Sequence, residues 1–181
     1  MSDDELLKIV TERYEYRSDG HLYYKIRLRG LSNKTVGTRA GNKHPDYGYI
    51  TLKILGKYYK EHCLVWLLHN GKLPYNEIDH INNVEDDNRI ENLRAATRET
   101  NCANRKGWGK SGFKGVSRYK REVRWLAYIR CNGVRYTLGR YNTKEEAARA
   151  YDRAAIKLHG EFALLNFSKE DYEDEYQRNA F

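Results

Sequence analysis

Cysteine is scarce in this chain, and no two cysteines lie close together in the sequence. The 181 residues include three cysteines, Cys63, Cys102 and Cys131, which stand far apart. Because no C-x-x-C pair occurs, the sequence argues against a zinc ribbon and gives no sign of a disulfide framework. A reducing, intracellular setting fits this cysteine usage best.

Long apolar segments are also missing. No run of residues is long enough to cross a membrane, so we expect no membrane partner. The N-terminal MSDDELLKIV is acidic and then only briefly apolar, which is unlike a secretory signal. With 40% hydrophobic and 32% charged residues, the composition is typical of a soluble globular protein with one large domain or a few small ones.

Acidic residues are scarce between residues 98 and 140. Residues 98–140 contain twelve Lys or Arg and two acids, whereas the segment after Phe167 contains two basic residues and five acids. The overall net charge of +8 is equally compatible with a role in solubility alone. The concentration of positive charge in one region, however, favours a polyanionic partner, with nucleic acid as the first candidate.

The N-terminal third predicts a short helix, a small antiparallel sheet and a second helix. Residues 1–12 are expected to be helical, with Ser2 as the N-cap. Residues 13–60 are rich in aromatic and β-branched residues separated by turn signals, which is typical of strands. The apolar segment 62–72 predicts a helix that ends at Gly71.

A mostly polar segment, EIDHINNVEDDNRIENLRAATRETN, follows this helix. Its loop is rich in Asn and Asp, whose side chains bind their own backbone and tolerate left-handed conformations. Thr97 is a plausible N-cap for the helix at its end. The expected elements are a strand at 77–81, a loop at 82–88, a second strand at 89–96 and a helix at 98–105.

This order of elements can bring oxygen ligands together. A helix folded back over the hairpin would let Asn101 face Asp79, and oxygen donors suit a hard cation such as Mg²⁺. The adjacent imidazole of His80 could remove a proton from water. From spacing alone, an ordinary polar loop is the commoner interpretation of such a segment. The acids at 85–87 also fit a solvated loop better than a ligand set.

The segment also resembles the H-N-H nuclease motif in the form carried by phage and intron homing endonucleases. The residues that carry the resemblance are Asp79-His80-Ile81, Asn88-Arg89, Glu91-Asn92-Leu93-Arg94 and Asn101, preceded by His62-Cys63-Leu64-Val65-Trp66 and Gly71.

This resemblance implies a ββα-metal fold and a role for each matching residue. His80 would be the general base, and Asn92 would brace the loop and orient the histidine through its backbone. Asp79 and Asn101 would hold one divalent metal, Mg²⁺ with Mn²⁺ as the alternative. Many members carry a histidine where Asn101 stands, and the carboxamide shifts the preference away from zinc.

Residues 112–167 predict a three-stranded sheet followed by one helix. Asn132-Gly133 is a strong hairpin signal, and Thr143 opens a capping box for a helix that ends at Gly160. The expected strands are 114–119, 124–131 and 134–141.

The same block resembles the Apetala-type DNA-binding domain of plant ethylene-response factors. The matching residues are Gly112 to Val116, Trp125 to Arg130, Leu138 to Tyr141, Ala147-Ala148, Ala150 to Asp152 and Leu164 to Phe167. The resemblance implies that the sheet enters the major groove of DNA with the helix behind it. Ser117 and Thr137 replace an expected Arg and Trp, so the plant target sequence cannot be carried over.

The spacing of the strand residues supports one DNA-facing surface. Arg124, Tyr128 and Arg130 share one face of their strand, whereas Trp125 and Ile129 lie on the other, toward the helix. The residues expected to contact DNA are Lys114, Arg124, Tyr128, Arg130, Arg135, Thr137 and Arg140.

Together these observations predict an α+β protein. Its expected parts are an N-terminal β-rich region (1–56), an H-N-H ββα-metal unit (57–105), a linker (106–111), an Apetala-type domain with a three-stranded antiparallel sheet and one packed helix (112–167) and an acidic tail (168–181). The expected function is that of a metal-dependent homing endonuclease that nicks duplex DNA as a monomer, in the cytoplasm of a phage-infected host cell. The alternatives are a DNA-binding regulator with an inactive nuclease unit and a structure-specific nuclease.

Overall fold

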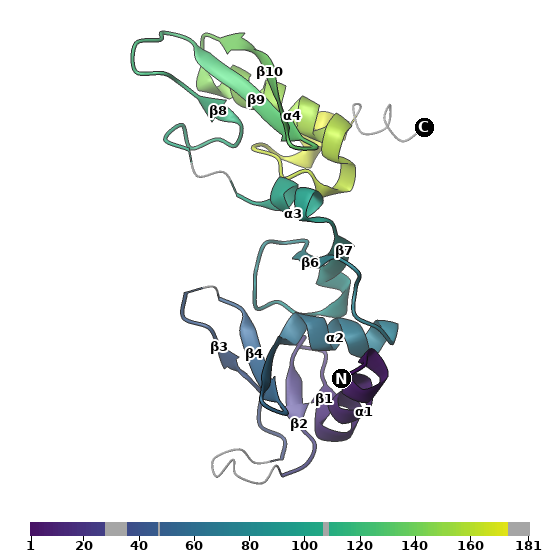
Figure 1. Ribbon diagram of the computed structural model, residues 1–181. Helices are drawn as coiled ribbons and strands as arrows, with labels where there is room; N and C mark the ends of the chain where they lie inside the picture. The colour runs from purple at the N-terminus through teal and green to yellow at the C-terminus, as the bar shows by residue number, and fades with distance from the viewer. Residues whose placement is uncertain (28–35, 47, 107–108, 174–181) are drawn as a thin grey trace. The chain divides into compact units, whose positions relative to one another are not determined.

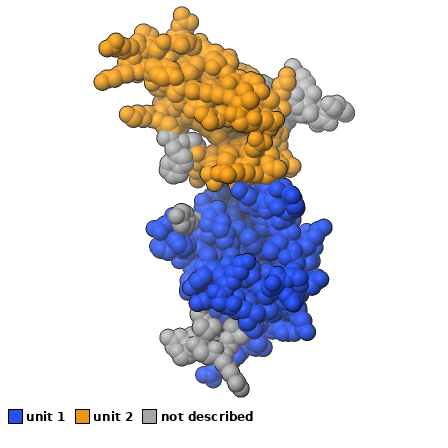
Figure 2. Space-filling view, viewed as in Figure 1, with its two compact units in different colours: residues 1–96 blue, residues 97–181 orange. Residues whose placement is uncertain are grey.

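The computed structural model of the chain describes residues 1–27, 36–46, 48–106 and 109–173 (Figure 1). It divides into two compact units, residues 1–96 and 97–181, which Figure 2 distinguishes by colour. This division falls ahead of the expected linker at 106–111, so the helix that follows Thr97 belongs to the second unit. The centre of that linker, residues 107 and 108, and the end of the acidic tail lie outside the described residues.

The described residues of the first unit form two α-helices and three small antiparallel sheets. Strands β1 and β2 form one sheet, β3, β4 and β5 a second, and β6 and β7 a third. Residues 13–60 were expected to form a single sheet, and they instead form the first two. The elements are α1 (Asp3–Arg13), β1 (Tyr14–Tyr16), β2 (Leu22–Tyr24), β3 (Asn42–Lys43), β4 (Ile50–Ile54), β5 (Lys57–Lys60), α2 (Glu61–Asn70), β6 (Glu77–His80), the 3₁₀ turn η1 (Ile90–Asn92) and β7 (Leu93–Ala96).

The helices of this unit begin and end as local sequence dictates. Ser2 and Glu5 form a capping box at the start of α1, which satisfies two backbone donors. Helix α2 ends at Gly71, whose φ of 73° is readily available to glycine. Apolar residues of both helices, including Val10 and Leu64, share one core with β2 and β4. This core holds the start of α2 next to the β6–β7 hairpin, where the site residues lie.

The second unit is a three-stranded antiparallel sheet with a helix packed on it, as Figure 1 shows. The strand order is β10-β9-β8, and the first strand is shorter than the expected 114–119. Its elements are α3 (Arg98–Asn104), β8 (Val116–Ser117), β9 (Trp125–Cys131), β10 (Val134–Tyr141), α4 (Lys144–His159) and the 3₁₀ turns η2 (Gly160–Phe162) and η3 (Lys169–Tyr172). The predicted α+β class is confirmed.

Close packing of α4 on the sheet depends on small residues. Ala148 and Ala155 are fully buried beneath the strands. Gly115 has a φ of +72°, and any side-chain carbon there would collide with the ring of Tyr151 on α4. A single hydrogen atom at position 115 therefore lets the Tyr151 ring lie against the backbone.

A buried carboxylate connects α4 to the C-terminal segment. Asp152 accepts hydrogen bonds from the backbone N–H of Asn166 at 2.8 Å and of Phe167 at 3.0 Å, and from the hydroxyl of Tyr172 at 3.0 Å. Burial raises the pKa of Asp152 above its ordinary value. Tyr172 is itself buried, so the segment expected to be an acidic tail begins as a packed turn.

Helix α3 packs inside this second unit. The backbone N–H of Leu164 donates to the carbonyl of Ala103 at 3.4 Å. The ammonium of Lys114 donates to the carbonyls of Ala103 and Arg105. The last carbonyls of a helix have no partner within the helix, so a lysine placed here satisfies them and complements the helix dipole.

Candidate functional site

The β6–β7 hairpin carries the first two predicted site residues. Asp79 pairs across the strands with Arg94, and His80 pairs with Leu93. Asp79 and His80 are both buried, at 4% and 5% exposure. The Nε and Nη2 atoms of Arg94 each lie 2.8 Å from Asp79 Oδ2, which neutralises the buried carboxylate.

The imidazole of His80 is held from the side by two aromatic rings. The His62 ring stands edge-on to it at 4.9 Å between centroids, and the Tyr49 ring lies at 6.0 Å. Burial, followed by the charges of His80 and Lys60, lowers the pKa of His62 to about 3. His62 is therefore a neutral packing partner at physiological pH.

One nitrogen of His80 is engaged by a buried polar chain. His80 Nε2 lies 2.9 Å from Asn88 Oδ1, and Asn88 Nδ2 donates to Glu61 Oε2 at 2.7 Å. Glu61 also accepts from the backbone N–H of Leu22 at 2.8 Å, and its Oε2 lies 3.0 Å from His21 Nδ1. A general base needs an orienting partner of this kind.

Asn92 ties the two ends of the polar loop together. Its amide donates to Asn82 Oδ1 at 3.0 Å and to the carbonyl of Asp87 at 2.8 Å, and its Oδ1 accepts from the N–H of Asn82 at 3.1 Å. Its carbonyl accepts from the N–H of Ile81, directly after His80, at 2.9 Å. These bonds connect the loop to the backbone that carries the histidine.

The two predicted metal ligands lie in different compact units. Asp79 is on β6 in the first unit, and Asn101 is on α3 in the second, where it is partly exposed. Among the described residues, no three His, Cys, Asp or Glu side chains are grouped as a metal-holding cluster. A carboxylate and a carboxamide oxygen are nevertheless donors that fit a hard divalent cation, which completes its coordination with water and phosphate oxygens.

The sheet of the second unit places several predicted DNA-contacting residues on one face. The register sets Arg130 opposite Arg135 and Tyr128 opposite Thr137. The guanidinium of Arg135 stacks over the Tyr128 ring at 3.9 Å. Ile129 points to the other face, where it packs against Tyr151 of α4.

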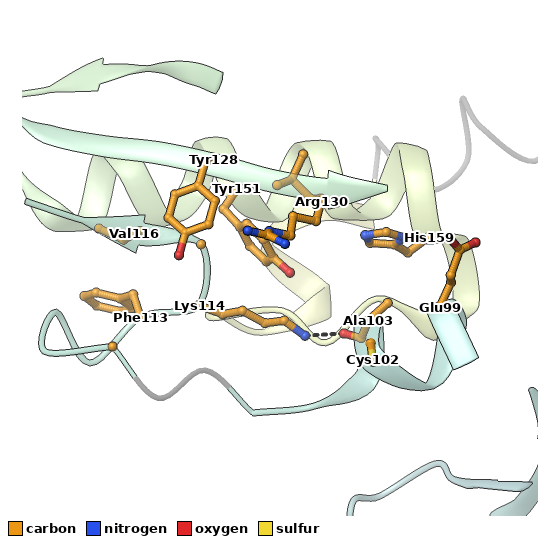
Figure 3. A pocket seen from close by; sticks show the side chains of 13 residues that line it. Glu99, Cys102, Ala103, Phe113, Lys114, Val116, Tyr128, Arg130, Tyr151 and His159 are labelled. Carbon is orange, nitrogen blue, oxygen red and sulfur yellow. Dashed lines mark hydrogen bonds between the residues drawn. The ribbon is translucent and has the colours of Figure 1, made fainter. Parts of the chain in front are cut away.

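The remaining predicted contacts differ in their surroundings. Arg124 is exposed directly ahead of β9, and Arg140 is exposed but lies 2.5 Å from the carboxylate of Glu122. Lys114 is held by the carbonyls of Ala103 in α3 and of Arg105 directly after it, inside a pocket that Arg130 and His159 also line (Figure 3). Burial lowers the pKa of Lys114 to about 8. The Lys114 ammonium therefore binds backbone carbonyls of its own unit, although this residue was predicted to contact DNA.

Sequence reasoning missed three partners in the first unit. Glu61 lies one residue ahead of the segment expected to be helical, 62–72, and was given no role. Asn88 and Arg94 were recognised as motif residues without a role. An acid at the first position of an otherwise apolar helix was the one available signal.

No helix among the described residues has the length and apolar character needed to cross a membrane.

Two family models match successive segments of the chain. Residues 59–103 match the model of the HNH endonuclease family, and residues 111–161 match that of the AP2 domain. The first match runs from β5 to α3 and so continues past the division between the two compact units.

The individual relatives include plant transcription factors and a viral HNH endonuclease. APETALA2-like protein 2 of Oryza sativa subsp. indica is 46% identical over 38% of this chain, and Ethylene-responsive transcription factor WRI1 of Arabidopsis thaliana is 30% identical over 95%. An uncharacterized HNH endonuclease of Acanthamoeba polyphaga mimivirus is 33% identical over 66%. The chain spans 16%, 39% and 63% of the lengths of these three proteins, respectively.

Proposed function

Because the chain contains an HNH endonuclease domain followed by an AP2 domain, we propose that it is a DNA endonuclease that the AP2 sheet docks on duplex DNA. The observation that supports catalysis most directly is His80. It is buried on β6 next to Asp79, and its Nε2 is engaged by Asn88. A histidine whose ring is oriented through one nitrogen is suited to take a proton at the other.

The proposed chemistry is hydrolysis of a phosphodiester bond. A divalent cation, Mg²⁺ or Mn²⁺, would polarise the scissile phosphate and stabilise the leaving oxygen when bound. Asp79 and Asn101 are the residues proposed to hold it. His80 would accept the proton of the attacking water, and Asn92 would keep the loop and the histidine backbone in place.

The proposed DNA-contacting face is the exposed side of β9 and β10. Arginine there can bind guanine edges and phosphates together, which suits a strand pair in the major groove. Its members are Arg124, Tyr128, Arg130, Arg135, Thr137 and Arg140. We leave Lys114 out of this face because its ammonium is held by the carbonyls of α3.

We further propose that the endonuclease has a homing role, cuts one strand and acts in a phage-infected cell. A unit with one active centre cuts one strand per binding event, so a monomer would nick duplex DNA. Its products would carry 5′-phosphate and 3′-hydroxyl ends. Sequencing the ends of products from a genomic digest tests the site preference and the cut pattern together.

The decisive experiment is a nicking assay on supercoiled plasmid with Mg²⁺, Mn²⁺ or EDTA. The parent protein should convert supercoiled to open-circular plasmid only with a divalent cation, and His80→Ala, purified in the same way, should not. Equal activity in the two proteins would remove the catalytic assignment. Binding series with RNA and branched DNA test the structure-specific alternative.

One observation favours a DNA-binding regulator as the second candidate. The carboxylate of Asp79 is occupied by Arg94, a contact that an inactive nuclease unit could keep permanently. A regulator of this kind would bind duplex DNA with the AP2 sheet and leave plasmid uncut under every metal condition. The same assay, run beside a DNA-binding titration, separates the two functions.

A further inference from the structure

A buried carboxylate outside the expected site is connected to His80. Glu61 at the start of α2 is completely buried, as is Asn88 in the loop ahead of η1. The Asn88 amide lies between Glu61 and His80. Its Nδ2 is 2.7 Å from Glu61 Oε2, and its Oδ1 is 2.9 Å from His80 Nε2. The start of α2 and the segment from His80 to Asn88 thus meet in one hydrogen-bonded chain.

Which atom donates in each of these hydrogen bonds follows from Glu61, the acceptor at the end of the chain. An ionised carboxylate can only accept, so the Asn88 atom that faces Glu61 is the NH₂ group. The Asn88 oxygen must then face His80, and an oxygen can only accept. His80 Nε2 therefore carries a proton, and in the neutral ring the lone pair is on Nδ1.

The environment of Glu61 keeps it an acceptor. The backbone N–H of Leu22 donates to Oε1 at 2.8 Å, and this donor cannot reverse its role. His21 Nδ1 lies 3.0 Å from Oε2, but the same nitrogen lies 2.8 Å from Arg39 Nη2, and a guanidinium can only donate. The donors to Glu61 are therefore the N–H of Leu22 and the amide of Asn88.

We propose that Glu61 is a positioning residue of the nuclease. Acting through Asn88, it selects the Nε2-protonated tautomer of His80 and so leaves Nδ1 to accept the proton of the attacking water. Glu61 touches no reacting atom in this scheme. The catalytic part of the inference rests on the proposed function, whereas the tautomer can be measured without it.

Glu61→Gln is the informative variant because it changes a hydrogen-bond direction and almost no volume. Its amide oxygen must face the N–H of Leu22, so its NH₂ group faces Asn88. The Asn88 amide is then expected to turn over and present its own NH₂ group to His80 Nε2. The result is the Nδ1-protonated tautomer, in which the proposed proton acceptor is blocked.

The primary test is ¹⁵N NMR of histidine-labelled full-length protein at pH 8, with Glu15→Gln as the matched control. Glu15 is an exposed acid on β1 of the same unit, paired with Arg17. The parent and the control should show His80 as Nε2–H, and Glu61→Gln should show it as Nδ1–H. An Nδ1–H signal in the parent overturns the proposal, even if Glu61→Gln does not fold.

The second test is the nicking rate of the same proteins. A residue that orients a catalytic group typically contributes on the order of 10- to 100-fold in activity. In Glu61→Gln, kcat should fall by that amount with KM for plasmid unchanged, whereas the Glu15→Gln control should match the parent. An unchanged tautomer or an unchanged kcat in folded Glu61→Gln overturns the inference. A parent that cuts no DNA refutes the proposed function, and the NMR result still decides the tautomer.

Discussion

Asp79 and Arg94 face each other across β6 and β7, and two nitrogens of Arg94 lie 2.8 Å from the same oxygen of Asp79. The cation that neutralises the proposed metal ligand is therefore part of the protein itself. A divalent ion at Asp79 would share the carboxylate with Arg94 or displace it. If Asp79 is a metal ligand as proposed, this pair would set the balance between the folded, metal-free protein and the metal-bound one.

Replacing Arg94 with Met should destabilise the metal-free protein and increase its response to metal. Removing one partner of a buried pair typically costs about 3 to 5 kcal/mol, because the other charge stays uncompensated. Mn²⁺ or Mg²⁺ should recover part of this loss, since a ligand that binds only the folded state stabilises it. Thermal unfolding with and without MnCl₂ measures both effects.

The control for Arg94→Met is the double variant Asp79→Asn/Arg94→Met, which should lose the enhanced metal response. An Arg94→Met protein that unfolds like the parent and shows no larger shift with Mn²⁺ would contradict the role assigned to this pair.

His62 should make the first unit sensitive to mild acid. Its pKa is lowered to about 3 by burial, whereas the unfolded chain has the ordinary value of 6.5. Between these values the unfolded state binds the extra proton, so stability falls as the pH decreases from 6.5 toward 3. At about 1.4 kcal/mol per pH unit, the expected loss between pH 7 and pH 5 is about 2 kcal/mol. His62→Phe should show a smaller loss in urea unfolding at these two pH values, and equal losses would exclude His62 as the source.

Gly115→Ala should strongly destabilise the second unit. The added carbon would collide with the Tyr151 ring and lie 2.6 Å from the carbonyl oxygen of Tyr128, at a φ of +72°. Overpacking and left-handed strain together predict a loss of about 3 kcal/mol. Gly133→Ala has a similar φ of +74° and no atom within 4 Å, so it should cost only about 1 kcal/mol. Urea unfolding compares the two, and equal losses would show that packing against Tyr151 is unimportant.

Arg135 and Lys114 should differ in DNA binding, although each substitution removes one positive charge. Arg135→Gln should weaken binding and reduce the slope of log K against log salt concentration by about 1 if the guanidinium contacts a phosphate. Lys114→Gln should leave the slope unchanged and lower the stability of the second unit, because its ammonium binds the carbonyls of α3. Salt titrations of both variants on one duplex provide the measurement, and a reduced slope for Lys114→Gln would return this residue to the DNA face.

Much of the fold was readable from local signals. The N-cap at Ser2, the capping box at Thr143, the Asn132-Gly133 hairpin and the stop at Gly71 all occur where the sequence predicts them. Each depends on hydrogen bonds or φ values within a few residues, so the information lies in the local sequence. The strand at 114–119 was predicted too long, because its pairing with β9 involves only Val116 and Ser117.

The sequence by itself determined the element types, the two resemblances and the identity of the candidate residues, from Asp79 and His80 to the arginines of β9 and β10. Only the tertiary structure decided which partner each side chain meets: Arg94 at Asp79, Asn88 and Glu61 behind His80, and the α3 carbonyls at Lys114. Glu61 and Asn88 are 27 residues apart and come together only because α2 packs beside the hairpin. Such pairings depend on how the core assembles, and periodicity carries no information about contacts of that range.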